Sequence, residues 1–225
     1  MGLFNKVLPM SVRLAFLYKE STAIAKDDRL SPQQKLEIIH EKEVKWSGKE
    51  GFNPKAVGEV QAPAICIGLK DMAGIFVKLN SPDDALRYIN AIGTSFSEIL
   101  NEQPVTAENA GKRQRIFEGL IFCWDHEANA YAQKNDIERV RLIYSKINQY
   151  MLATIEEDPS NKRLNDLYNH MNYQTYNTFI NMANAFPTTR QEAYLTCLRL
   201  LKSFDHRDPG NDILQDLIGR FHEGS

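Results

Sequence analysis

Two short histidine-containing clusters carry the residue types most suited to metal chemistry. Asp125, His126 and Glu127 are consecutive, and His206 lies between two aspartates near the end of the chain. If their helices met, Asp125, His126 and His206 could form the site of an all-α metal-dependent hydrolase. However, Ala130 stands one turn after His126, where a zinc-protease helix carries its second histidine. Adjacent helical residues also point about 100° apart, so at most two of each cluster can face one site. We therefore expect no metal.

Other catalytic patterns are missing from the sequence. There is no glycine-rich phosphate loop and no Gly-x-Ser-x-Gly nucleophile turn. Cys66, Cys123 and Cys197 are odd in number and far apart, unlike a disulfide framework or a paired Cys-x-x-Cys metal site. They lie in apolar helical patterns, where thiols usually serve as inert packing. We expect no cofactor, and a reducing, cytoplasmic location.

A run of asparagines with interleaved tyrosines is the most unusual polar feature. Asn is a mediocre helix former, because its amide competes for backbone hydrogen bonds, so many in one helix need a reason. One reason is peptide binding, since a carboxamide both donates and accepts hydrogen bonds and a tyrosine adds contact area with a polar tip. The other explanation is that these side chains form a solvated helix face or hydrogen-bond to neighbouring helices. The residues are Asn161, Asn165, Asn169, Asn172, Asn177, Asn181 and Asn184, with Tyr168, Tyr173 and Tyr176.

Composition is that of an ordinary globular protein with no charge bias. Hydrophobic residues make up 43% and charged residues 25% of the 225 residues. Lys plus Arg number 27 against 29 Asp plus Glu, which leaves a formal charge of −2 and gives no reason to expect nucleic acid as a partner. The apolar stretch 7–18 is too short to span a bilayer and is interrupted by Pro9 and Arg13. We expect no membrane span.

Helix signals are dense, and alternation typical of strands is hard to find, so the chain is expected to be all-α. Ser31-Pro32 and Ser81-Pro82 each read as an N-cap followed by a proline in the first turn. The turn-forming stretch 48–54 separates an N-terminal helix pair from the rest. The second expected helix begins at 31–32 and precedes the break at 48–54. The other expected helices cover residues 9–26, 54–79, 82–100, 106–133, 136–156, 161–186, 189–204 and 213–221.

A spacing of large apolar, alanine and aromatic residues recurs three times. The copies are Leu69, Met72, Ala73 and Phe76; Trp124, Glu127, Ala128 and Tyr131; and Phe179, Met182, Ala183 and Phe186. The first continues with Ala85 and Ile89 and the second with Val140 and Tyr144, and every matched pair differs by 55 in residue number. The third continues with Ala193 and Cys197, which come two residues earlier than the same offset of 55 would place them. Such self-similarity predicts a reused helix pair that buries its apolar face by stacking, and these residues are expected in the core.

This pattern resembles the tetratricopeptide repeat, in a degenerate form with a period near 55 instead of 34. The small residue lets two crossing helices approach closely. The resemblance implies an α-solenoid of about nine antiparallel helices in one domain, 1–225, with an N-terminal helix pair (1–50), repeats (54–205) and a C-terminal capping helix (211–223). It departs from the family in its late prolines, Pro159 and Pro209.

In tetratricopeptide arrays the first helix of each pair lines a concave groove. Transferring that register implies a binding surface for a peptide segment or a partner helix, as in an adaptor, chaperone or effector-type scaffold. Gly74 stands where the family's carboxylate clamp would place a second amide, so the clamp itself is not expected. The implied groove residues are Lys70, Lys78, Phe122, Asp125, Asn129, Gln133, Tyr173, Asn177 and Asn184.

A second alternative to peptide binding is a structural subunit that self-associates through its first helix. That helix carries more apolar surface than one helix pair needs. Its large apolar residues are Phe4, Val7, Leu8, Leu14, Phe16, Leu17 and Tyr18. Packing inside the monomer would account for the same residues.

Overall fold

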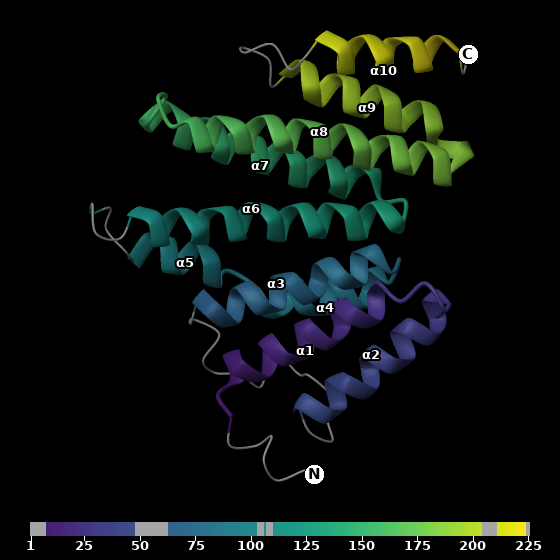
Figure 1. Cartoon of the computed structure of the whole chain (residues 1–225). Helices are drawn as coiled ribbons and strands as arrows, with labels where there is room; N and C mark the ends of the chain where they lie inside the picture. Colours follow the sequence, from purple (N-terminus) through teal and green to yellow (C-terminus); the bar gives the residue numbers. More distant parts are fainter. Residues whose placement is uncertain (1–7, 48–62, 103–105, 107–109, 204–210, 224–225) are drawn as a thin grey trace. The chain divides into compact units, whose positions relative to one another are not determined.

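A computed structural model of the chain describes residues 8–47, 63–102, 106, 110–203 and 211–223 (Figure 1). Every secondary-structure element among the described residues is a helix and none is a strand, which confirms the all-α expectation. The helices are α1 (Met10–Ala25), α2 (Pro32–Ser47), α3 (Pro63–Lys78), α4 (Pro82–Ile92), α5 (Ser95–Glu102), α6 (Ala110–Gln133), α7 (Ile137–Glu157), α8 (Lys162–Ala185), α9 (Arg190–Ser203) and α10 (Asn211–Glu223), with a short 3-10 turn, η3 (Pro187–Thr189).

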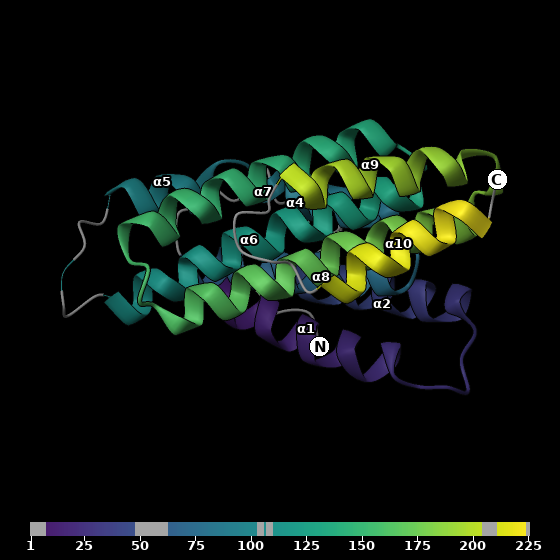
Figure 2. The ribbon, with the colours of Figure 1, turned by 90° about the horizontal axis from the view of Figure 1, so that it is seen from above.

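The helices form two compact units. The first unit is Met1–His126 and the second is Glu127–Ser225, so the boundary falls within α6. In the first unit, α1 packs against α2 and α3, and α3 also packs against α4 and α5. Figure 2 shows α1 and α2 joined at one end, as an antiparallel pair requires. The central position of α3 explains why half of its residues are buried.

The second unit is arranged around α9. This helix packs against α7, α8 and α10, and α7 also contacts α8. The α7–α8 and α8–α9 connections lie at opposite ends of these helices, so the chain runs back and forth (Figures 1 and 2). Tyr176 of α8 also donates a hydrogen bond to Asp216 of α10, which Arg220 holds at 2.6 Å. The last helix is thereby attached by polar as well as apolar contacts.

Side-chain caps define several helix starts, including the one expected at Ser31. At Ser81, also expected as a cap, the side chain forms no cap bond, and Ser81 Oγ donates to Asp84 Oδ2 at 2.7 Å instead. Gln34 N donates to Ser31 Oγ at 3.2 Å, and Ser31 N donates to Gln34 Oε1 at 2.9 Å. This reciprocal pair is a capping box, which satisfies two backbone donors at the start of α2. Asp136 caps α7 and Asn161 caps α8 through their side-chain oxygens. One asparagine of the Asn-rich run therefore has a structural role.

The 55-residue repeat reappears in the turns that end α3 and α6. Asn80 and Asn135 have φ of 56° and 58°, the left-handed region. Behind them, Ser81 N donates to Phe76 O at 2.9 Å, and Asp136 N donates to Tyr131 O at 3.0 Å. Both turns are Schellman-type ends with asparagine where glycine is usual. The third copy ends differently: Pro187 begins a 3-10 turn directly after Phe186. This different turn accounts for the early arrival of its second half.

The expected helix 82–100 is two helices. Gly93 has φ of 53° and ends α4, its N–H donating to Ile89 O at 3.1 Å, and α5 begins at Ser95. Glycine adopts this left-handed conformation without steric cost, which makes the break possible. The other expected boundaries agree within a few residues where the chain is described. The break at 48–54 and the start of the helix expected at 54–79 lie outside the described residues.

The repeated pattern supplies core residues, as predicted. Leu69, Met72, Ala73 and Phe76 are each at most 1% exposed. Most of the matching residues in the other copies are also buried, and Glu127, Tyr131 and Phe186 are half-buried. Ala73, Ala128 and Ala183 are fully buried, consistent with helices that approach closely at those positions. These residues are therefore occupied by packing, and a ligand must be sought elsewhere.

Candidate binding pocket

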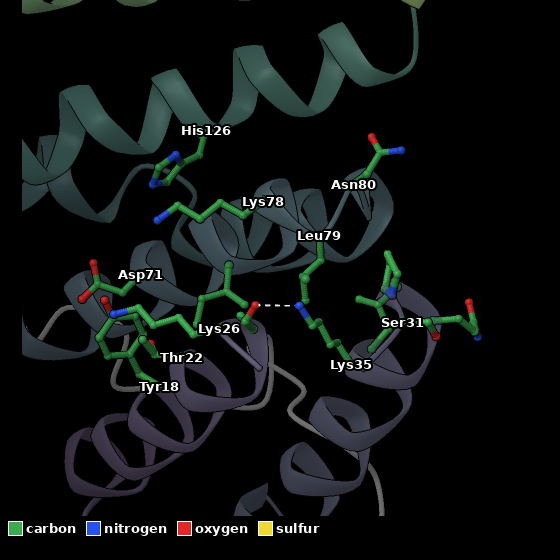
Figure 3. Close-up of a pocket in the computed structure, with 16 residues that line it drawn as sticks. Tyr18, Thr22, Lys26, Ser31, Lys35, Asp71, Lys78, Leu79, Asn80 and His126 are labelled. Carbon is green, nitrogen blue, oxygen red and sulfur yellow. Dashed lines mark hydrogen bonds between the residues drawn. The ribbon is translucent and has the colours of Figure 1, made fainter. Parts of the chain in front are cut away.

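A hollow of about 870 Å³ opens in the first unit (Figure 3). Its walls come from the end of α1, the start of α2 and the second half of α3, with His126 of α6 closing one part. In Figure 3, Ser31 and Asn80 lie toward one end, and Tyr18, Asp71 and His126 toward the other. Ligand sites in proteins typically occupy about 300–1,000 Å³. The hollow is therefore large enough for a small ligand or a short peptide segment.

Local structure places two lysines at the junction of α1 and α2. Lys26 is the C-cap residue of α1, and Lys35 lies in the first turn of α2. Lys35 Nζ donates to Ala25 O at 2.9 Å, the dashed line in Figure 3. This bond satisfies a carbonyl at the end of α1, where the helix dipole also favours a positive charge. Lys35 thus stabilises the connection while contributing its charge to the hollow.

The end of α3 supplies the third lysine, Lys78, together with Asn80. The side chain of Lys78 extends below the ring of His126 in Figure 3. His126 fits there because Gly74 has no side chain: a Cβ at position 74 would lie 2.7 Å from His126 Nε2. The same glycine that removes the clamp amide expected in the tetratricopeptide family thus gives room for an imidazole.

His126 is a neutral imidazole at neutral pH. Burial is the largest cause, and the positive charges of Lys70 and Lys78 add to it; together they lower the pKa of His126 to about 4. The Asp125 carboxylate lies beside it, with 3.9 Å between its Oδ2 and His126 Nδ1. The side chain of His126 is 22% exposed, so it remains accessible from the hollow.

Positive charge predominates in the hollow. Lys26, Lys35 and Lys78 line it, and Asp71 is the carboxylate among the lining residues. That carboxylate is already engaged, since Lys70 Nζ lies 2.6 Å from Asp71 Oδ1. Apolar walls complete the site, provided by Leu36, Ile75, Leu79, Pro32 and the ring of Tyr18. The arrangement suits an occupant that carries both negative charge and apolar surface.

Comparison with protein family models, curated proteins and solved structures finds no match to this chain. The tetratricopeptide likeness therefore stays a resemblance of spacing.

Of the groove residues inferred from that resemblance, Lys78 lines the hollow. Lys70 also belongs to the first unit, but its ammonium group pairs with Asp71 and lies 5.8 Å from the ring centre of Phe122. Asp125 is 6% exposed, so it is a buried group and not a wall of an open groove. The structure thus collects these four residues on α3 and α6, with one of them at the pocket.

The remaining predicted residues belong to the second unit. Asn129 Oδ1 accepts a hydrogen bond from Thr178 Oγ1 at 3.1 Å, so this amide has an intramolecular partner. Gln133 is half-buried, and Tyr173, Asn177 and Asn184 are exposed on α8. None of them lines the hollow of the first unit. Whether they contact a partner stays a prediction.

The asparagines of α8 divide by role. Asn161 caps the helix and the Asn165 amide donates to Pro159 O and Asn161 O, at 3.1 and 3.0 Å. Asn172 is buried, whereas Asn169, Asn177, Asn181 and Asn184 are exposed. Both explanations of the run therefore apply to part of it, because some amides bond within the chain and others face outward.

The metal-site alternative has no support in the described part of the chain. No group of three or more histidine, cysteine, aspartate or glutamate side chains there could hold an ion. Asp125 and His126 are the described members of the proposed set, and His206 lies outside the described residues. Cys66 and Cys197 are buried, which raises the pKa of Cys66 to about 11 and that of Cys197 further. Such thiols are unsuited to nucleophilic chemistry near neutral pH.

A second polar cluster joins α2 to α4 and was not anticipated. Glu43 is 4% exposed and accepts hydrogen bonds from Tyr88 Oη and, at 2.8 Å, from Arg87. His40 Nε2 lies 3.2 Å from Asp84 Oδ2 beside it. Burial, with the adjacent Glu43 charge, raises the pKa of Tyr88 well above its usual value, so the phenol stays protonated. None of these residues lines the hollow, and the cluster holds the two helices together.

Sequence reasoning identified His126 as a metal ligand candidate and missed its place beside a cationic hollow. Lys26 and Lys35 were missed altogether, because the N-terminal helix pair falls outside the repeat register. A usable signal was present: the chain places lysines around the 26–31 connection and at the end of the first motif helix.

No described helix is long and apolar enough to cross a bilayer.

Proposed function

We propose that this chain is a protein–protein interaction module of tetratricopeptide-like helix pairs, and that the hollow of the first unit binds a segment of a partner protein. The observation that carries the proposal is the hollow itself, an open site of about 870 Å³ with apolar and polar walls. Its opposite ends are marked by Asn80 and His126 (Figure 3), so an extended segment has contacts along its length.

The repeated turns support the tetratricopeptide-like part of this proposal. Asn80 and Asn135 adopt the same left-handed conformation at equivalent positions of two helix pairs, with equivalent hydrogen bonds behind them. A helix pair that recurs with its turn is the unit from which solenoids are built. We propose that the pairs within each unit stack in this manner.

The chemistry of the walls favours binding over catalysis. Nucleophilic catalysis needs a base within hydrogen-bond reach of a serine, threonine or cysteine. Across the described ranges, His126 forms no hydrogen bond to any such residue, and Ser31 is engaged in the cap of α2. The polar side chains of the hollow can therefore recognise a ligand without reacting with it, as an interaction module requires.

The proposal is tested by selecting a random displayed peptide library on the purified full-length protein. Selected peptides are then measured by fluorescence anisotropy against two tryptophan variants on neighbouring positions of α1. Thr22 lines the hollow, and Ala23 is exposed and does not line it. Thr22→Trp fills the site and should weaken binding by about tenfold or more, as expected when a central contact region is blocked. Ala23→Trp should bind like wild type.

Circular dichroism melting checks that both variants fold. If both bind every selected peptide as tightly as wild type does, the hollow is not the peptide site and the proposal fails.

A further inference from the structure

The charges in the hollow are unbalanced in a way that the whole chain is not. The sequence carries a formal charge of −2, with acidic residues slightly in excess. Yet three lysines line the hollow, and Asp71, the one carboxylate among the lining residues that the structure describes, pairs with Lys70 at 2.6 Å. A local positive site on a slightly acidic protein indicates a specific anionic ligand, since the protein as a whole attracts no polyanion.

Two of the three lysines have no counter-charge in the described ranges. Lys26 and Lys78 form no ion pair with any residue that the structure describes, whereas Lys35 donates to Ala25 O. Lys35 also acts on the Asp27 carboxylate, which Arg29 already holds at 2.7 Å. Lys26 and Lys78 are therefore the groups able to pair with an incoming anion.

We infer that the hollow of the first unit binds an acidic peptide segment, whose side-chain carboxylates lie against Lys26 and Lys78 while its apolar side chains contact the walls. This inference rests on the proposed function and adds the chemistry of the partner to it. Charge complementarity of this kind contributes chiefly to the rate of association and to specificity.

The lining favours a peptide segment over free phosphate. Leu36, Ile75 and Leu79 give the walls an apolar area that a free phosphate would not use. Single-stranded nucleic acid sites typically stack bases on aromatic residues. Within the described part of the chain, Tyr18 is the one aromatic ring that lines the hollow besides the imidazole of His126.

The neutral state of His126 fits an occupant of this kind. Lys70 and Lys78 of α3 act on it electrostatically, Asp125 of its own helix lies beside it, and Asp71 of α3 lines the same hollow. Since its pKa is about 4, the imidazole adds no charge near neutral pH and can donate or accept a hydrogen bond. A backbone amide or a carboxylate of a bound segment would provide either partner.

The test uses a fluorescein-labelled peptide of alternating glutamate and leucine, with the matched peptide of glutamine and leucine as its neutral counterpart. Anisotropy is measured with the full chain at about physiological salt. We expect the acidic peptide to bind about tenfold more tightly than the neutral one, and added salt to weaken the acidic peptide alone.

Paired variants locate the charge effect. The double variant Lys26→Gln/Lys78→Gln removes two lining lysines, and Lys19→Gln/Lys112→Gln removes two exposed lysines of the same unit that do not line the hollow. The first should lose about fivefold to tenfold in affinity for the acidic peptide, and the second should lose less than about twofold. Both remove the same formal charge, so the difference isolates position. The salt dependence of the wild type tests the inference even if a double variant folds poorly.

Three outcomes would overturn the inference. The acidic and neutral peptides could bind equally, the two double variants could weaken binding equally, or inorganic phosphate or a short single-stranded RNA could displace the acidic peptide more effectively than the unlabelled peptide does. If library-selected peptides bind the hollow but are not acidic, the inference fails while the proposed function stands. If filling the site through Thr22→Trp affects no peptide, the proposed function fails as well.

Discussion

His126 shows how one small residue determines the chemistry of another. The imidazole occupies space that any side chain at position 74 would take, since a Cβ there would approach Nε2 to 2.7 Å. Placed over Gly74, the ring is largely withdrawn from water and lies in the field of Lys70 and Lys78. Both effects disfavour the imidazolium form. The pair Gly74 and His126 therefore gives the hollow a neutral polar group between its positive charges.

This environment predicts a dependence of stability on pH. In the folded protein the pKa of His126 is lowered from 6.5 to about 4, so between these values the unfolded chain binds a proton that the folded chain does not. Stability is therefore full above about pH 6.5 and falls as the pH decreases toward 4. The loss between about pH 7 and pH 5 should be about 2 kcal/mol.

Urea unfolding at the two pH values, in the wild type and in His126→Gln, measures this loss. Carboxylates titrate in both proteins, so the difference between their pH responses isolates the imidazole. His126→Gln should lose about 2 kcal/mol less than the wild type over this interval. Equal losses in the two proteins would mean that His126 is protonated normally in the folded state.

At the residue scale, the sequence predicts contacts between residues that are close along one helix, but not contacts between helices that are far apart in the chain. The core positions Leu69, Ala73 and Phe76 follow from spacing along one helix, and all are buried as expected. Lys26, Lys78 and His126 come together through packing of helices far apart in the chain, and no local pattern encodes that packing. Hence the core could be predicted from periodicity, while the candidate site required three-dimensional information.

At the scale of elements, helix starts were predictable because caps are local. Ser31 with Gln34 and Asp136 with Arg139 satisfy backbone donors within three residues, and both positions were expected as helix starts. Helix ends were harder. Gly93 interrupts a continuous apolar pattern, and its left-handed conformation, not its hydropathy, ends α4. The pattern Ala85, Ile89 and Ile92 continues toward Phe96 as if the helix did.

The two repeated turns allow a paired comparison. Asn80 and Asn135 share a left-handed conformation, but Asn135 Oδ1 also accepts a hydrogen bond from Thr189 Oγ1 at 2.9 Å. Glycine relieves the left-handed strain at both positions. Asn80→Gly should therefore leave stability unchanged or raise it by up to about 1 kcal/mol, whereas Asn135→Gly should lose about 1 kcal/mol with the hydrogen bond.

Thermal unfolding followed by circular dichroism distinguishes the two glycine variants. As a control on the conformation, Asn80→Val places a β-branched residue in the left-handed region and should destabilise by about 1–2 kcal/mol. If Asn80→Val were harmless, the turn would not depend on the left-handed conformation. If the two glycine variants behaved alike, the bond from Thr189 would contribute nothing measurable.

At the scale of the whole molecule, each compact unit has one helix that packs against three others. In the first unit α3 packs against α1, α4 and α5, and in the second unit α9 packs against α7, α8 and α10. By contrast, α2 packs chiefly on α1, and α10 chiefly on α9. The hollow lies between the α1–α2 pair and the central α3, so its walls include α2, which packs chiefly on one helix, and α3, which packs on three.

This difference predicts the order in which backbone amides open. Amide exchange reports local unfolding, and helices with few buried contacts open at lower free energy than those surrounded on several sides. Amides of α3 should therefore exchange more slowly than those of α2, and amides of α9 more slowly than those of α10. Hydrogen–deuterium exchange read by mass spectrometry at peptide resolution measures both comparisons in one experiment.

A bound acidic peptide that contacts Lys26 and Lys78 should slow exchange in the last turn of α1 and the first turns of α2, because opening these helices would release it. Slowing confined to α8 would instead place the binding surface on the exposed Tyr173 and Asn177.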